Sequence, residues 1–119
     1  MGEKVRIEYT DETGKDQLLL KSNSAHVREF VQYIPFVLEK RNEKYQHLTV
    51  NVAEFKSVLE AKLPKIFDEM DDIDRHLAEI IYSEVSFVVE KLRKIAMKQS
   101  LIGLSIYTFA GDTLNDRCV

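Results

Sequence analysis

The sequence predicts an α+β fold in which an N-terminal β-hairpin and one or two short strands pack on a helical layer. Residues 4–21 alternate polar and apolar side chains on either side of a glycine-containing turn, which is the pattern of a hairpin. After Val27, apolar side chains recur at helical spacing. One further helix, expected at about residues 70–99, is long enough to dominate the helical layer.

The composition is typical of one globular domain. The chain has 119 residues, of which 45% are hydrophobic and 31% are charged, so it can bury a single core. We expect one domain over residues 1–119, with the last few residues frayed. No apolar stretch approaches the roughly 20 residues that cross a bilayer, and Met1–Thr10 lacks the apolar run of a signal peptide. A cytoplasmic protein is expected, or a protein of the host cytosol if the source is viral.

The hairpin is the first predicted element. Lys4–Tyr9 forms its first strand, Asp11–Asp16 its turn and Gln17–Lys21 its second strand. Gly14 can adopt the positive φ that such a turn uses. Because two strands alone are only marginally stable, the hairpin must pack on a helix or gain further strands.

A helix is predicted next, beginning near Ala25. Its N-cap candidates and its apolar positions follow from the spacing: Ser22, Asn23 and Ser24 for the cap, and Val27, Phe30, Val31, Ile34, Val37 and Leu38 for the buried side. Pro35 interrupts this pattern, so either the helix kinks there or a second short helix starts with Pro35 in its first turn. Basic residues near the expected end suit the helix dipole: Lys40, Arg41 and Lys44.

A short strand over 47–52 is predicted after this helix, with Leu48, Val50 and Val52 on one face. Asn51 and Glu54 have capping-box spacing, so Asn51 is expected to cap another helix. The apolar positions of that helix, and the proline that ends or kinks it, are Phe55, Val58, Leu59, Leu63 and Pro64.

The long helix follows, with a break expected around Glu69–Asp72. Its charges are sorted along its axis, with acids first and bases last, which stabilises a helix at both ends. These charges are Asp68, Glu69, Asp71, Asp72 and Asp74, then Lys91, Arg93, Lys94 and Lys98. Its apolar residues span an arc of roughly 200°, about twice what a surface helix needs. They are Ile73, Leu77, Ile80, Ile81, Val85, Phe87, Val88, Val89, Leu92, Ile95 and Ala96.

The chain is expected to close with a strand over Leu101–Ala110, in which apolar and other residues alternate, followed by a turn at Gly111–Thr113. The order of hairpin, helix and strand over residues 4–52 is similar to that of β-grasp (ubiquitin-like) and BTB/Skp1-like folds. No motif of either family matches residue by residue, so the similarity implies no function.

The wide apolar arc predicts a protein partner. We expect a homodimer in which two long helices lie antiparallel, so that the acidic end of one meets the basic end of the other. The residues expected at this interface are Val85, Val88, Val89, Leu92, Ile95 and Lys98, with Glu84 and Lys91 as orienting charges. The alternative is that the arc serves only the core of one chain and that the charges only complement the dipole.

A second hypothesis is a metal-dependent or small-ligand enzyme that uses Asp72, His76 and Glu79. These residues follow Glu69 at spacings of three, four and three, and so share one helix face. The face lies opposite the apolar arc, where a solvated stripe is the simpler interpretation, and no second ligand pair is seen on another helix. No cofactor is therefore expected.

A third hypothesis is a nucleic-acid-associated protein that uses Lys91, Lys94 and Lys98, which share a helix face, with Lys40, Arg41 and Lys44 as a second basic cluster. The net charge of −3 and the pI near 5.6 give it no long-range support. Catalytic motifs are lacking as well: the glycines form no phosphate-binding loop, and Cys118 has no rigid base beside it in sequence. The leading interpretation is a non-catalytic interaction protein, namely a small cytosolic adaptor, inhibitor or regulatory subunit.

Overall fold

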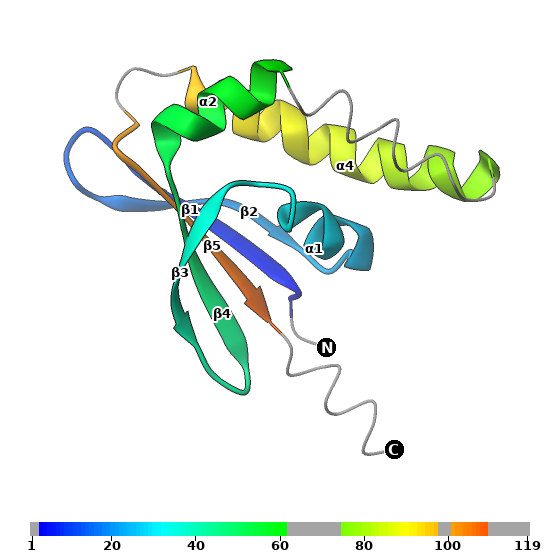
Figure 1. The fold of residues 1–119 in the computed structure, drawn as a ribbon, viewed down its shortest axis with the longest axis horizontal. Coiled ribbons are helices and arrows are strands. Elements are labelled where there is room, and N and C mark those ends of the chain that lie inside the picture. Colours follow the sequence, from blue (N-terminus) through cyan, green and yellow to red (C-terminus); the bar gives the residue numbers. More distant parts are fainter. Residues whose placement is uncertain (1–2, 62–74, 98–100, 110–119) are drawn as a thin grey trace.

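The structure is a computed structural model that describes residues 3–61, 75–97 and 101–109. It has an α+β fold, as predicted, with five strands and three helices in these ranges (Figure 1). The elements are β1 (Val5–Thr10), β2 (Asp16–Ser22), α1 (Ala25–Val31), β3 (Phe36–Arg41), β4 (Tyr45–Val50), α2 (Val52–Ala61), α4 (Arg75–Ala96) and β5 (Gly103–Phe109).

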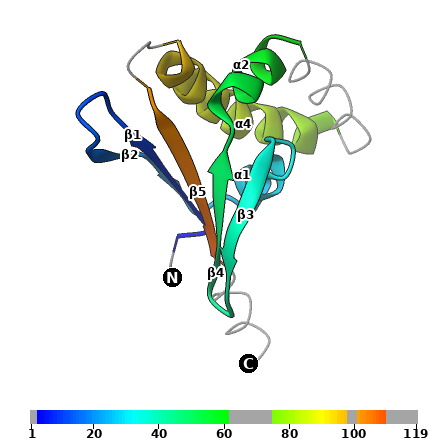
Figure 2. The ribbon, with the colours of Figure 1, turned by 60° about the vertical axis from the view of Figure 1, so that its left-hand side comes forward.

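The strands form one antiparallel sheet in the order β2-β1-β5-β4-β3. The sheet contains two hairpins, β1–β2 and β3–β4, and the last strand in sequence, β5, lies between them. Figure 2 shows this strand running between β1 and β4, with the helices gathered on one side of the twisted sheet. β2 and β3 are therefore the two edges.

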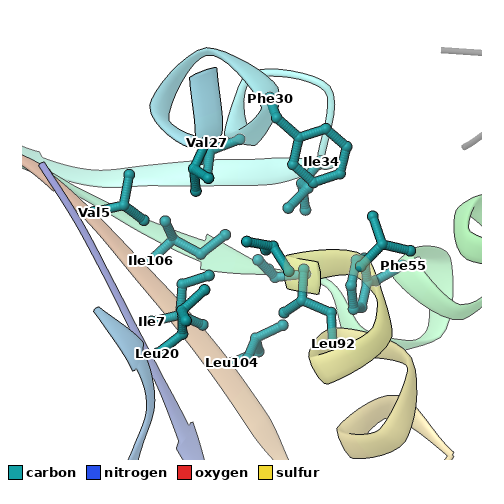
Figure 3. Packing of buried hydrophobic residues seen from close by; sticks show 14 of the residues in the cluster. Val5, Ile7, Leu20, Val27, Phe30, Ile34, Phe55, Leu92, Leu104 and Ile106 are labelled. Carbon is teal, nitrogen blue, oxygen red and sulfur yellow. The ribbon is translucent and has the colours of Figure 1, made fainter. Parts of the chain in front are cut away.

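The core lies between the helices and one face of the sheet (Figure 3). Alternation along the three middle strands directs every second side chain to this face. These side chains are Val5 and Ile7 of β1, Leu48 and Val50 of β4, and Leu104 and Ile106 of β5. The helices contribute further side chains to the same cluster, among them Phe30, Phe55 and Leu92. α4 packs against both α1 and α2.

The N-terminal hairpin is organised by one carboxylate. Oδ1 of Asp11 accepts hydrogen bonds from the backbone N–H groups of Thr13 (2.9 Å) and Lys15 (3.0 Å), and Oδ2 accepts one from Nε2 of Gln17 (3.1 Å). Gly14 adopts a φ of +82°, as its place in the turn predicted. The side-chain hydrogen bonds from Thr13 and Gln17 favour the ionised form and lower the pKa of Asp11 to about 2.

The prediction of a helix through residues 36–38 was wrong, because this segment is strand β3. α1 ends at Val31. Three backbone hydrogen bonds between residues three apart follow, the last from the N–H of Ile34 to the carbonyl of Val31 (3.0 Å). Pro35 cannot donate to a helix and disfavours helical backbone at Ile34. Residues 36–41 can instead pair with β4, because Oδ1 of Asn42 closes the turn by accepting from the N–H groups of Lys44 (2.7 Å) and Tyr45 (3.0 Å).

The basic residues Lys40, Arg41 and Lys44 therefore belong to a hairpin and not to a helix end. The strand predicted over 47–52 is confirmed as β4, although it ends at Val50, and Val52 already belongs to α2. Asn51 caps α2 as expected, because its Oδ1 accepts from the N–H of Glu54 (3.1 Å).

Three further predictions of local structure are confirmed among the described residues. Ser24 is the N-cap of α1, and Leu104, Ile106 and Thr108 alternate as the buried residues of β5. α4 occupies Arg75–Ala96 of the helix expected at about 70–99. Several predicted features lie outside the described residues: the break at 69–72, the acidic cluster, Leu63, Pro64, Ile73, Lys98, the turn at 111–113 and Cys118.

Shortening a side chain of the core should cost far more than shortening the same residue type on the surface. Ile106 is fully buried, whereas Ile102 is 63% exposed. We expect Ile106→Ala to lower the free energy of unfolding by about 2–5 kcal/mol, because it leaves a cavity. Ile102→Ala, the matched control, should change it by less than about 0.5 kcal/mol. Urea unfolding measures both, and equal losses would contradict the position of β5 in the core.

Asp11 should titrate far below an ordinary aspartate. Its lowered pKa means that it stabilises the fold above pH 3.8, its ordinary pKa, and that this contribution is lost as the pH falls towards 2. An NMR titration of the Asp11 carboxyl group should give a midpoint near 2. In Gln17→Ala one hydrogen bond to the carboxylate is absent, so the midpoint should rise. An unperturbed midpoint in the wild type would contradict the turn geometry.

Candidate functional site

Helix α4 is the element on which the sequence placed an interface, and its two halves differ in burial. From Arg75 to Glu84 no side chain of the helix is buried. From Val85 to Ala96 six side chains are buried, because α1, α2 and the sheet cover this half. Figure 1 shows the N-terminal half of α4 extending past α1 and past the strands. The helix is therefore longer than the layer that it covers.

The side chains chosen for the interface lie mostly in the core of the chain itself. Five of them are buried: Val85, Val88, Val89, Leu92 and Ile95. Val85, Val88, Val89 and Leu92 belong to the core cluster formed with the sheet and the other helices, so they are not available on the surface of this structure. Lys98, which was predicted with them, lies outside the described residues.

A second apolar stripe on α4 is exposed. Leu77 and Ile80 are each 41% exposed and Phe87 is 58% exposed. Positions 77, 80, 84, 87 and 91 alternate three and four residues apart, so they line one side of the helix. We call Leu77, Ile80 and Phe87 the exposed stripe. All three belonged to the predicted arc, but the sequence could not show which part of that arc the chain itself covers.

Glu84 lies within the line of the exposed stripe and attaches α4 to the start of α1. Its Oε2 accepts a hydrogen bond from Oγ of Ser24 and lies 3.0 Å from Nδ1 of His26. Ser24 Oγ also accepts from the N–H groups of His26 (3.2 Å) and Val27 (3.3 Å) and so caps α1. The pKa of Glu84 is lowered, mainly by the hydrogen bond from Ser24 and to a smaller extent by that from His26.

These three residues do not have the geometry of a catalytic triad. A triad needs a histidine between the serine and the carboxylate, so that the imidazole accepts the serine proton. Here one oxygen of Glu84 contacts both Ser24 and His26. Glu84 therefore fastens one helix to another, and this is a different role from the orienting charge that the sequence suggested. The sequence indicates Ser24 as an N-cap, but it does not indicate its contact with Glu84, which lies 60 positions later.

Lys91 contacts the exposed stripe. Its Nζ lies 5.0 Å from the centroid of the Phe87 ring, within the range of a cation–π interaction. Arg93 forms an exposed ion pair with Glu90 (3.6 Å), one turn earlier on the helix. The basic end of α4 is thus present among the described residues as Lys91, Arg93 and Lys94.

The proposed metal stripe is only partly described. His76 and Glu79 are exposed on α4, and Asp72 lies outside the described residues. In residues 3–61, 75–97 and 101–109, no three histidine, cysteine, aspartate or glutamate side chains lie close enough to hold a metal ion. The nucleic-acid patch predicted on α4 is also only partly described: Lys94 is exposed, and Lys98 lies outside the described residues.

Comparison with known proteins gives no relative for this chain: no family model, no curated protein and no solved structure matches it. Within the described ranges, no helix is long and apolar enough to cross a membrane.

Glu84 should stabilise the protein through α1, which can be tested with an isosteric change. Because its carboxylate is 39% exposed, we expect Glu84→Gln to cost about 1 kcal/mol of unfolding free energy, below the range of buried charged hydrogen bonds. Glu79→Gln, on an exposed position of the same helix, should cost less than about 0.5 kcal/mol. Chemical unfolding at neutral pH compares the two.

The same interaction has a defined pH dependence. Since the folded pKa of Glu84 lies below its ordinary value of 4.5, the stabilisation is complete above pH 4.5 and is lost as the pH falls through the folded pKa. The difference in stability between the wild type and Glu84→Gln should therefore shrink in acid. A difference that stays constant down to the acid-unfolding range would contradict this role.

Proposed function

We propose that this protein is a non-catalytic protein-binding module, of the adaptor, inhibitor or regulatory-subunit type, that self-associates through the exposed stripe of α4. The observation that carries the proposal is the exposure of Leu77, Ile80 and Phe87 on one side of a helix that extends beyond its own sheet. Three large apolar side chains share one side of the helix, with Glu84 between Ile80 and Phe87, whereas apolar residues scattered singly over a surface need no explanation.

A second copy of the same helix fits this surface. Apolar residues alternating three and four apart are the pattern by which two helices pack along each other. In a two-fold pair the same stripe serves both partners, so no second kind of surface is required. With the two-fold axis at the level of position 82, an antiparallel arrangement places Leu77 of one copy close to Phe87 of the other, so the stripe of each copy faces that of its partner.

The charges favour the antiparallel arrangement. The C-terminal half of the helix carries Lys91, Arg93 and Lys94 on exposed or half-buried positions. Acids precede Arg75 in the sequence, over residues 68–74. Two antiparallel copies bring basic and acidic segments together, whereas two parallel copies bring like charges together. Salt should therefore weaken the association without abolishing its apolar part.

Changing the exposed stripe should weaken self-association and leave the fold intact. We expect the wild type to associate at high micromolar concentration in sedimentation velocity. Phe87→Lys and Ile80→Lys should each weaken the association about tenfold or more, because they place a charge in the centre of the apolar contact. Tyr82→Lys is the control, since Tyr82 is also exposed on α4 but lies on another side of the helix.

Circular dichroism would verify that the three variants keep their helix and strand content. A strict monomer at high micromolar concentration, at both low and high salt, would rule out the proposal. Equal weakening by Tyr82→Lys would place the contact on a different side of α4.

A further inference from the structure

The face of the sheet opposite the helices carries a row of cations and aromatic rings that crosses all five strands. We call this side the outer face. Register pairs Lys21 with Arg6, Arg6 with Tyr107, Tyr107 with His47, and His47 with Lys40. Strands lie about 4.8 Å apart, so the row is about 19 Å wide. Its centre is aromatic and both of its ends are basic.

The aromatic centre continues along β4 and β5. The rings of His47 and Tyr107 are stacked, with centroids 4.6 Å apart and planes 9° from parallel. Tyr45 contacts both Tyr107 (6.1 Å) and Phe109 (5.8 Å) at tilted angles. All four side chains are half-buried, so this aromatic strip is packed against its neighbours and still reaches solvent.

Nε2 of His47 is buried and has no hydrogen-bond partner within the described part of the chain. The ring is thus held by stacking on Tyr107 and not by a polar contact at this nitrogen. Burial is also the main reason that the pKa of Tyr107 is raised. The strip therefore places four neighbouring rings in contact with one another on the outer face.

The cations around this strip are mostly unpaired. Arg6 is held by Glu8 (2.7 Å) and Glu3 (3.4 Å). Lys4, Lys21 and Lys40 take part in no ion pair among the described residues. Asp16, the other acid of β1 and β2 on this face, pairs with Thr10 at the opposite end of the strands. One half of the outer face is therefore basic and aromatic, although the whole chain has a net charge of −3.

We propose that this half of the outer face binds single-stranded nucleic acid. The site consists of the strip and its surrounding cations: Tyr45, His47, Tyr107 and Phe109, with Lys4, Arg6, Lys21 and Lys40. Unpaired bases stack on aromatic side chains with little dependence on sequence, and lysines contact the backbone phosphates. A duplex hides the faces of its bases, so it can use only the cations.

The unpaired lysines favour a nucleic acid over a protein partner. Lysine is depleted at the centre of protein interfaces, because its charge must be desolvated there. Against a polyanion the same lysines gain affinity by releasing counterions. This site is not the lysine patch predicted on α4. It includes Lys40, which lies beside the aromatic residues because residues 36–41 form strand β3.

Fluorescence anisotropy with labelled oligo(dT) and oligo(U) of about 16 nucleotides tests the proposal. With the three lysines in contact, the logarithm of the association constant should fall with the logarithm of salt concentration with a slope of about −2. Tyr45→Leu keeps an apolar side chain but removes the ring, and should weaken binding about tenfold. The double variant Lys21→Glu with Lys40→Glu should weaken it at least as much, and both positions are exposed, so the fold is retained.

Lys94→Glu on α4 is the matched control and should bind like the wild type, as should Phe87→Lys. The proposal is overturned if neither oligonucleotide binds at low salt, if a duplex of equal length binds as tightly, or if Lys94→Glu is as harmful as the outer-face variants. It is also overturned if the outer-face variants change only the sedimentation of the protein, which would make this face a contact between copies. If Tyr45→Leu unfolds, the lysine double variant decides.

Discussion

The insertion of β5 between the two hairpins is the constraint on which the rest of the structure depends. Each hairpin alone is a marginal two-stranded unit, and neither has enough apolar surface to form a core. β5 pairs with β1 on one side and β4 on the other, and so makes them one sheet. Its buried residues Leu104 and Ile106 complete the surface on which the described helices pack. Because β5 follows these helices in the sequence, this sheet can close only after they have been synthesised.

The one-sided helical layer has two consequences for function. First, a sheet covered on one face leaves the other face in contact with solvent, and the alternation of each strand decides which side chains lie there. Second, the sheet can cover only part of a helix as long as α4. The N-terminal half of α4 therefore presents Leu77 and Ile80, and the outer face presents Tyr107 and His47. Both surfaces arise because the helices cover only one face of the sheet and because α4 is longer than the sheet, and not from any sequence motif.

The interactions that attach these surfaces to the core are polar. Glu84 joins α4 to the N-cap of α1, and Asp11 closes the β1–β2 turn through a set of backbone and side-chain hydrogen bonds. Each carboxylate accepts these hydrogen bonds in its ionised form, and this lowers the pKa of each group. The apolar core provides most of the stability, whereas these contacts fix how the turn and the short helix are oriented.

The sequence by itself determined the elements whose signals are local. The β1–β2 hairpin, the Ser24 and Asn51 caps, the alternation in β5 and the long amphipathic helix were all predicted, because turn chemistry and periodicity act over a few residues. Only the tertiary structure decided the rest. Residues 36–41 became a strand because β4 was available to pair with them beyond Pro35, and Val85 and Leu92 were buried because a sheet assembled from distant segments covers them. The row from Lys21 to Lys40 likewise joins five strands, and such a neighbourhood arises from strand order, which local periodicity does not encode.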